Sequence, residues 1–329
     1  MVRRLIFLLV LASIAWATYV VLVPTGPNRE AFVEILPGTP TMQIAAELKQ
    51  QGLIRSKYAF EAARLAKGGT LKAGEYRFDH PAKMSEVYDR LERGDVYTLT
   101  VTIPEGANLF DIAQRIETAN LGTKEKFLAA AREDVNLIAE LDPGATSLEG
   151  YLFPDTYHFE RRATPQQMLT AMVKRFRQAA AGLGLRANYH RVVTVASLVE
   201  RETPVDAERP VVASVFENRL AKEMPLATDP SVIYAALLDG RYRGTIYASD
   251  LQADSPYNTY RYAGLPPGPI CNPGMASLKA AMNPARTDYL YFVAATADAS
   301  GKSRFSVTLE EHAHNVQEYR KSLREAGSR

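Results

Sequence analysis

A glutamate at the end of a buried helix could act as a general acid. In residues 191–204 the apolar side chains recur at helical spacing, and Glu200 follows the last of them, at the margin of the buried face. Pro204 favours an end to this helix just before it. A carboxyl group in that position loses part of its hydration and therefore holds a proton more readily near neutral pH. An ion pair with Arg201 or Arg209 is the competing interpretation.

Aromatic rings and carboxylates lie close together in residues 147–157. The Gly and the Pro in this stretch exclude a long regular helix, so a loop is predicted. Such a loop suits sugars, because their C–H faces stack on aromatic rings and their hydroxyls donate to carboxylates. The candidate sugar contacts are Glu149, Tyr151, Asp155 and Tyr157. An ordinary loop plugged by its own aromatic side chains is the alternative.

A second loop, rich in Pro and Gly, occupies residues 255–274. Few conformations are open to such a loop, so its amides and Asn side chains can be held in place for a ligand. This favours a binding groove whose candidate contacts are Asn258, Tyr260 and Asn272. The only cysteine, Cys271, excludes an intramolecular disulfide and is predicted to pack in the interior.

Several other chemistries find no support in the chain. It contains no Gly-x-Ser-x-Gly elbow, P-loop, dinucleotide fingerprint or His-Glu-x-x-His motif, and no cofactor is expected. His312 and His314 are two residues apart, so on a helix they point to different sides, which disfavours a metal site. A net charge of +2 argues against a dedicated nucleic-acid binder.

The amino terminus predicts a membrane anchor. After a cytoplasmic start at residues 1–4, the uncharged run from Leu5 to Val23 is long enough to cross a hydrocarbon core of roughly 30 Å. The arginines that precede it should stay in the cytoplasm, which places the rest of the chain outside. A cleavable signal peptide is the alternative, because residues 15–17 have the small-x-small form of a cleavage site. The apolar run continues past that site and favours an uncleaved anchor.

The remainder predicts an α+β protein. Residues 24–30 should form a tether, residues 31–140 an α+β region and residues 141–329 a larger mixed α+β catalytic domain. Residues 33–53 and 101–121 share a strand, a glycine turn and an Ile-Ala pair on a short helix, and both resemble the first half of a LysM module. Further helices are expected over 109–140, 166–180, 190–202 and 204–222. Thr228 or Asp229 is predicted to cap the helix that follows.

Six short motifs follow one another in a fixed order. They are Glu149-Gly-Tyr-Leu-Phe-Pro-Asp-Thr-Tyr157, Ala196-Ser-Leu-Val-Glu-Arg-Glu-Thr203, Ala213-Ser-Val-Phe-Glu-Asn-Arg-Leu220, Thr228-Asp-Pro-Ser-Val-Ile-Tyr234, Tyr257-Asn-Thr-Tyr260 and Gly264-Leu-Pro-Pro-Gly268. Together they strongly resemble the MltG-type endolytic murein transglycosylases, also called the YceG-like family. The resemblance extends over roughly residues 30 to 325 and includes the apolar amino terminus.

This resemblance implies an enzyme of the bacterial inner (cytoplasmic) membrane whose catalytic domain faces the periplasm. Such an enzyme is a lyase that cuts glycan strands in nascent peptidoglycan, leaves 1,6-anhydro ends and works beside peptidoglycan synthases. The family's catalytic glutamate lies in its Ala-Ser-x-Val-Glu motif, which places it at Glu200. Glu149 is the candidate second carboxylate. A membrane-anchored scaffold that binds peptidoglycan without cutting it is the main alternative, and a hydrolase that uses Glu200 with Glu149 or Asp155 is another.

Overall fold

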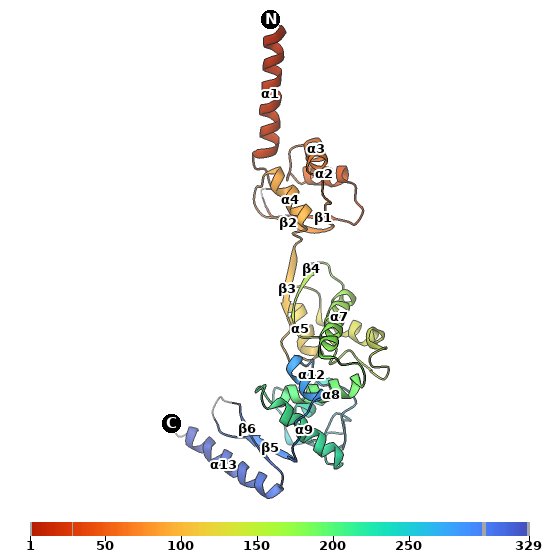
Figure 1. Ribbon diagram of the computed structural model, residues 1–329, viewed down its shortest axis with the longest axis vertical. Helices are drawn as coiled ribbons and strands as arrows, with labels where there is room; N and C mark the ends of the chain where they lie inside the picture. The colour runs from red at the N-terminus through yellow and green to blue at the C-terminus, as the bar shows by residue number, and fades with distance from the viewer. Residues whose placement is uncertain (1, 28, 298–300, 328–329) are drawn as a thin grey trace. The chain divides into compact units, whose positions relative to one another are not determined.

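The computed structural model describes residues 2–27, 29–297 and 301–327, and the chain forms two compact units (Figure 1). Unit 1 contains the chain up to Leu99 together with His158–Arg162. Unit 2 contains Thr100–Tyr157 and the chain from Ala163 onward. Both units combine helices with short strands, which confirms the predicted α+β class. The division follows Leu99, whereas the sequence suggested a boundary near residue 140.

Unit 1 is a two-stranded sheet covered by helices. Strand β1 (Ala31–Ile35) pairs antiparallel with β2 (Gly74–Phe78), and Val33 lies opposite Tyr76. The helices are α1 (Val2–Leu22), α2 (Thr41–Gln50), α3 (Lys57–Lys67) and α4 (Met84–Arg93). Apolar side chains from β1, β2, α2, α3 and α4 share one core, which includes the fully buried Phe60 and Tyr88.

The end of α1 is fixed to unit 1. Val20 is buried, and Val21 packs against the core of the unit. Arg55 donates a hydrogen bond of 3.0 Å to the backbone oxygen of Pro24. Backbone hydrogen bonds of 2.9 and 3.1 Å join Thr25 to Ala82. The start of the predicted tether therefore lies bound to the unit. α1 itself is long and apolar enough to cross a membrane.

Unit 2 is mainly helical. Its helices are α5 (Leu109–Thr118), α6 (Lys124–Glu133), the 3-10 helix η1 (Val135–Ile138), α7 (Pro165–Leu183), α8 (Tyr189–Glu202), α9 (Arg209–Ala221), α10 (Asp229–Leu238), α11 (Ala248–Leu251), α12 (Met275–Met282) and α13 (Leu309–Gly327). Strands β5 (Tyr291–Ala294) and β6 (Ser303–Ser306) pair antiparallel. Strands β3 (Thr98–Thr102) and β4 (Thr156–Glu160) pair where the chain passes between the units.

The predicted helix over 109–140 is broken into α5, α6 and η1. Asn120 adopts a left-handed conformation with φ of 58°, which ends α5, and the Thr123 side chain caps α6. Both predicted strand-turn-helix repeats are present, as β1 with α2 and as β3 with α5. The first repeat lies in unit 1, and α5 of the second lies in unit 2.

Helix α8 lies at the centre of unit 2. Every residue from Val193 to Val199 is buried, and α8 packs against α9, α10 and α12. The Ser197 hydroxyl accepts a hydrogen bond of 3.1 Å from the backbone of Ile270. The Pro/Gly-rich loop is thereby drawn into the core, and Cys271 is buried there as predicted.

Gly150 should be indispensable to this packing. Its φ is +87°, and an added Cβ would lie 2.5 Å from Pro269 and 2.7 Å from Val193. We expect Gly150→Ala to lower the free energy of unfolding by roughly 2–5 kcal/mol, from backbone strain and overpacking. The matched control is Gly182→Ala in α7, where an added Cβ meets nothing within 4 Å. It should gain up to about 1 kcal/mol. Denaturant unfolding of both variants measures the difference, and equal stabilities would contradict this account.

Candidate active site

Two glutamates emerge at the carboxyl end of α8. Glu200 and Glu202 are two residues apart, so they point to sides of the helix that differ by about 200°. Their surroundings are consequently unlike, and the structure gives them different partners.

Both carboxylate oxygens of Glu200 are occupied by donors. Arg209 donates to Oε1 at 2.7 Å, and the backbone N–H of Gly274 donates to Oε2 at 2.9 Å. The side chains of Glu200 and Arg209 are only 5% and 6% exposed. Arg209 also donates to Ser277 and, at 3.0 Å, to Asp206. Glu200 is therefore part of a buried ion pair that joins α8 to α9 and α12, which was the competing interpretation of its position.

Among the described residues, Glu202 has fewer polar partners than Glu200. It lines a cavity of about 450 Å³. Within the described part of the chain its carboxyl has a single hydrogen-bond partner, the Thr228 hydroxyl, which donates to Oε1. Burial raises the pKa of Glu202 above that of an ordinary carboxyl group, and the nearby Asp229 charge adds to the rise. A raised pKa makes the carboxyl a better proton holder than an exposed glutamate, and the oxygen that does not bind Thr228 is the one that could carry the proton.

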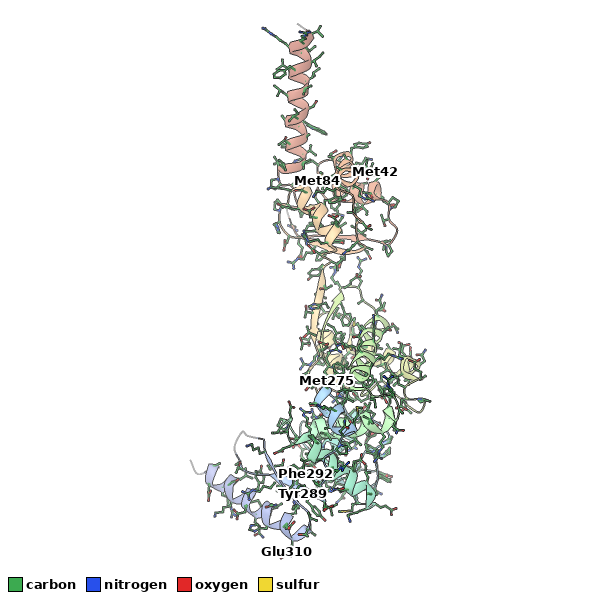
Figure 2. All side chains as sticks on the ribbon, viewed as in Figure 1. Met42, Met84, Met275, Tyr289, Phe292 and Glu310 are labelled. Atoms are coloured by element: carbon green, nitrogen blue, oxygen red, sulfur yellow. The ribbon has the colours of Figure 1, made fainter. Side chains whose placement is uncertain are left out.

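The cavity beside Glu202 combines charges with aromatic faces. Tyr260 donates a hydrogen bond of 2.7 Å to Oδ1 of Asp229. The rings of Tyr291 and His312 stack with their centres 5.2 Å apart. Phe292, labelled in Figure 2, also lines the cavity. Carboxylates beside aromatic side chains are suited to binding a sugar ring.

Arg219 stabilises the wall of this cavity. It donates to the backbone oxygen of Leu290 at 2.6 Å and to that of Leu226 at 2.7 Å. Its guanidinium carbon lies 5.3 Å from the centre of the Tyr291 ring. Burial lowers the pKa of Arg219. The arginine thus holds the segment before α10 against β5, so both sides of the cavity are fixed.

Comparison with known proteins identifies the chain. The YceG-like family profile matches residues 33–318. This chain belongs to the YceG-like family. An endolytic murein transglycosylase of Bacillus subtilis is 35% identical over 314 residues, which cover 89% of this chain and 86% of that protein. One of Streptococcus pneumoniae is 31% identical over 91% of this chain, which spans 60% of the length of that protein.

A solved structure agrees with this membership. The crystal structure of a yceG-like protein from Listeria monocytogenes superposes with a TM-score of 0.55 at 34% sequence identity. The match covers 87% of this chain and 99% of that one. The mixed helix and strand architecture of the chain is therefore shared with a solved yceG-like protein.

Most of the sugar contacts predicted from the sequence lie inside this YceG-like fold. The buried ones are Glu149, Tyr151, Tyr157, Asn258 and Asn272. Their polar atoms are bonded within the protein: the Tyr151 hydroxyl donates to Asp142 at 2.8 Å, the Tyr157 hydroxyl to the Phe153 backbone at 2.5 Å, and the Asn258 amide to the backbone oxygens of Leu251 and Ala253. Side chains buried to this degree have little or no surface with which to contact a glycan strand. For Glu149, Tyr151 and Tyr157 this agrees with the alternative interpretation of residues 147–157, an ordinary loop plugged by its own aromatic side chains.

The two remaining candidates are more accessible. Asp155 forms an ion pair of 2.6 Å with Arg175. Tyr260 is 40% exposed and is the only one of the predicted contacts that lines the Glu202 cavity.

The sequence motifs did not single out Glu202 and its neighbours as candidates. The adjacent Thr228 and Asp229 were expected to cap a helix, but the Thr228 side chain makes no capping bond to α10 and donates to Glu202 instead. The available signal was the pair Thr228 and Asp229 before a helix, and a pair of this kind is ordinarily interpreted as a helix cap. Among the described residues no group of three or more potential ligands could hold a metal ion.

Glu149 and Asn272 meet in the core of unit 2. Oε2 of Glu149 accepts from the backbone N–H of Leu109 at 2.9 Å, and Oε1 accepts from Asn272 at 2.8 Å. Asn272 accepts in turn from the backbone of Leu152 at 2.8 Å. Glu149 therefore joins the start of α5 to both loops. Burial raises its pKa to about 8, from an ordinary value of 4.5, although the bond from Leu109 opposes the rise.

The raised pKa of Glu149 predicts how stability depends on pH. Between about 4.5 and 8 the folded protein keeps a proton that the unfolded chain releases, so stability is greatest below this window and falls as the pH rises through it. The slope should reach about 1.4 kcal/mol per pH unit. We expect Glu149→Gln to flatten this dependence, and Glu125→Gln on the surface of α6 to leave it unchanged. Denaturant unfolding at a series of pH values measures both, and equal slopes would contradict the assignment.

Proposed function

We propose that this chain is an endolytic murein transglycosylase in which Glu202 is the general acid and base. Its membership of the YceG-like family and the names of its relatives support the reaction, the cutting of peptidoglycan by a lyase. One observation supports the residue: Glu202 has a raised pKa and lines a cavity, whereas Glu200 two positions earlier is bound to Arg209. The motif of the YceG-like family had suggested Glu200, which is therefore the alternative assignment.

The first step breaks the glycosidic bond. Protonated Glu202 donates its proton to the oxygen between N-acetylmuramic acid and N-acetylglucosamine, and the bond from this oxygen to the muramic anomeric carbon breaks. The Thr228 hydroxyl accounts for one carboxyl oxygen, so the other is free to carry the proton. The positive charge that develops on the sugar is stabilised by the negative charge of Asp229, which lines the same cavity.

The second step closes a ring. Glu202, now a carboxylate, takes the proton from the muramic 6-hydroxyl, and this oxygen bonds to the anomeric carbon. The product is a 1,6-anhydro end, the proton returns to Glu202 and no water is consumed. Exclusion of water from the anomeric carbon is therefore part of the specificity, and the exposed Tyr260 side chain in the cavity would serve it.

The amino-terminal half supplies the setting for this reaction. We infer that α1 anchors the chain in the inner membrane with the rest of the chain in the periplasm, because its length and composition suit a span and Arg3 and Arg4 lie in its first turn. We also infer a LysM-like sugar-binding role for the strand-turn-helix of unit 1. Peptidoglycan synthases that produce the nascent glycan would be the partners of such an enzyme.

The decisive experiment compares Glu202→Gln with Glu200→Gln in the full-length protein. Glu202→Gln should reduce the release of anhydro-muropeptides from purified peptidoglycan by about 10³-fold or more, because the amide cannot donate and recover a proton. It should leave the thermal unfolding temperature nearly unchanged. Glu200→Gln should instead lower that temperature, because it leaves the buried Arg209 without its charge partner.

The products separate the alternatives. Mass spectrometry should find 1,6-anhydro ends, whereas a hydrolase would leave reducing ends and a scaffold would bind glycan without shortening it. Full activity in Glu202→Gln, together with an inactive but normally folded Glu200→Gln, would return the role of general acid to Glu200.

A further inference from the structure

Helix α3 is apolar on two faces. Its inner face packs on the core of unit 1 through Phe60, which is fully buried. Its outer face exposes Tyr58, Ala62, Leu65 and Ala66, which recur at helical spacing. The exposure is unusually high for large side chains, at 69% for Tyr58 and 78% for Leu65. The outer face thus has the composition of a buried surface but is uncovered.

Basic residues surround this outer face. The segment from Arg55 to Lys67 contains four basic residues and one acidic residue. Lys57 lies beside the exposed Tyr58 ring, 5.2 Å from its centre. Lys67 forms an ion pair with Asp89 at the far end of α3. An exposed apolar stripe with a basic border is the pattern of a helix that lies in the headgroup region of a membrane.

The end of α1 lies next to α3. Arg55, just before α3, donates to the backbone oxygens of Val23 and Pro24, and its guanidinium lies 4.5 Å from the centre of the Tyr19 ring. α1 and α3 are also in direct contact. In Figure 1, α3 lies on the side of unit 1 where α1 enters. A bilayer that contains α1 would therefore face α3.

The length of α1 leaves no spacer between the bilayer and the rest of unit 1. From Leu5 to Leu22 the helix rises about 27 Å, at about 1.5 Å per residue. A hydrocarbon core is about 30 Å thick, so the whole run is needed to cross it. Its last turn is nevertheless packed against unit 1 through Val20 and Val21. The adjacent surface of the unit must then lie at the boundary of the hydrocarbon.

We propose that the outer face of α3 inserts into the headgroup layer of the bilayer that α1 crosses. Tyr58 and Leu65 enter the apolar boundary, and the basic residues around them bind anionic phosphate groups. The proposal rests on the membrane anchoring put forward above. Together with α1, α3 gives unit 1 a second attachment and a fixed orientation on the membrane surface. A protein partner on the same face is the competing occupant, but the basic border and the adjacent membrane helix favour lipid.

A single-tryptophan experiment tests the proposal. Trp16 is the only tryptophan, so Trp16→Phe with Leu65→Trp places one reporter on α3 of the full-length chain. In vesicles of phosphatidylethanolamine and phosphatidylglycerol, lipids with brominated acyl chains should quench this tryptophan, and its emission should shift to the blue. Tyr58→Trp in the same background is a second reporter in case one variant folds poorly. The matched control is Glu160→Trp, an exposed position on β4 in unit 1, which should not be quenched.

The outcomes separate this proposal from the anchoring and from the enzyme. Flotation of the vesicles reports whether α1 anchors the chain, and release of anhydro-muropeptides by the same preparation reports the activity. Quenching at positions 58 and 65, with more of it as the phosphatidylglycerol fraction rises, supports the proposal. A floating, active protein with an unquenched tryptophan at both positions overturns it. Protection from aqueous quenchers without quenching by lipid also overturns it, and points to a protein partner.

Discussion

The burial of α8 on all its sides is the constraint on which unit 2 depends. A helix whose consecutive residues from Val193 to Val199 are all buried needs cover in every direction, and α9, α10, α12 and the loop before α12 supply it. At the carboxyl end of α8 this burial is unfavourable for the polar side chains of Glu200 and Glu202, which lose part of their hydration. Each of them must find a partner there, because a buried charge without one is strongly destabilising.

Buried hydrogen bonds hold the loops around this helix in place. Glu149 and Asn272 connect the two Pro- and Gly-containing loops to the start of α5, and Ser197 connects α8 to the second loop. These loops carry the most distinctive motifs of the chain, yet their polar side chains hold the backbone in place. Many motif residues in this fold thus stabilise the loops from the interior, whereas residues at neighbouring positions line the Glu202 cavity.

The sequence was sufficient to predict the helix but not the surroundings of its two glutamates. Helical spacing predicted α8 almost to its ends, and the paired strand-turn-helix units were also recognised. Periodicity assigns a residue to a face, but it carries no information on what covers that face. The partners of Glu200 are the side chain of Arg209 and the backbone of Gly274, which reach it only through the packing of α9 and α12. The same limit applies to Tyr151 and Asn258, whose types suit sugar binding but whose positions are internal.

The separation of the two glutamates by one residue has a chemical consequence. Arg209 supplies its charge to Glu200 and not to Glu202, so the proton affinity of Glu202 is set mainly by burial and by Asp229. Arg219 does line the cavity, and its charge opposes the rise in the pKa of Glu202. Its Nε and Nη1 atoms donate to the backbone oxygens of Leu290 and Leu226, and among the described residues it forms no ion pair with Glu202. The ion pair at Glu200 also fixes the end of α8, and a rigid helix end is what a proton donor needs to meet its substrate in one geometry.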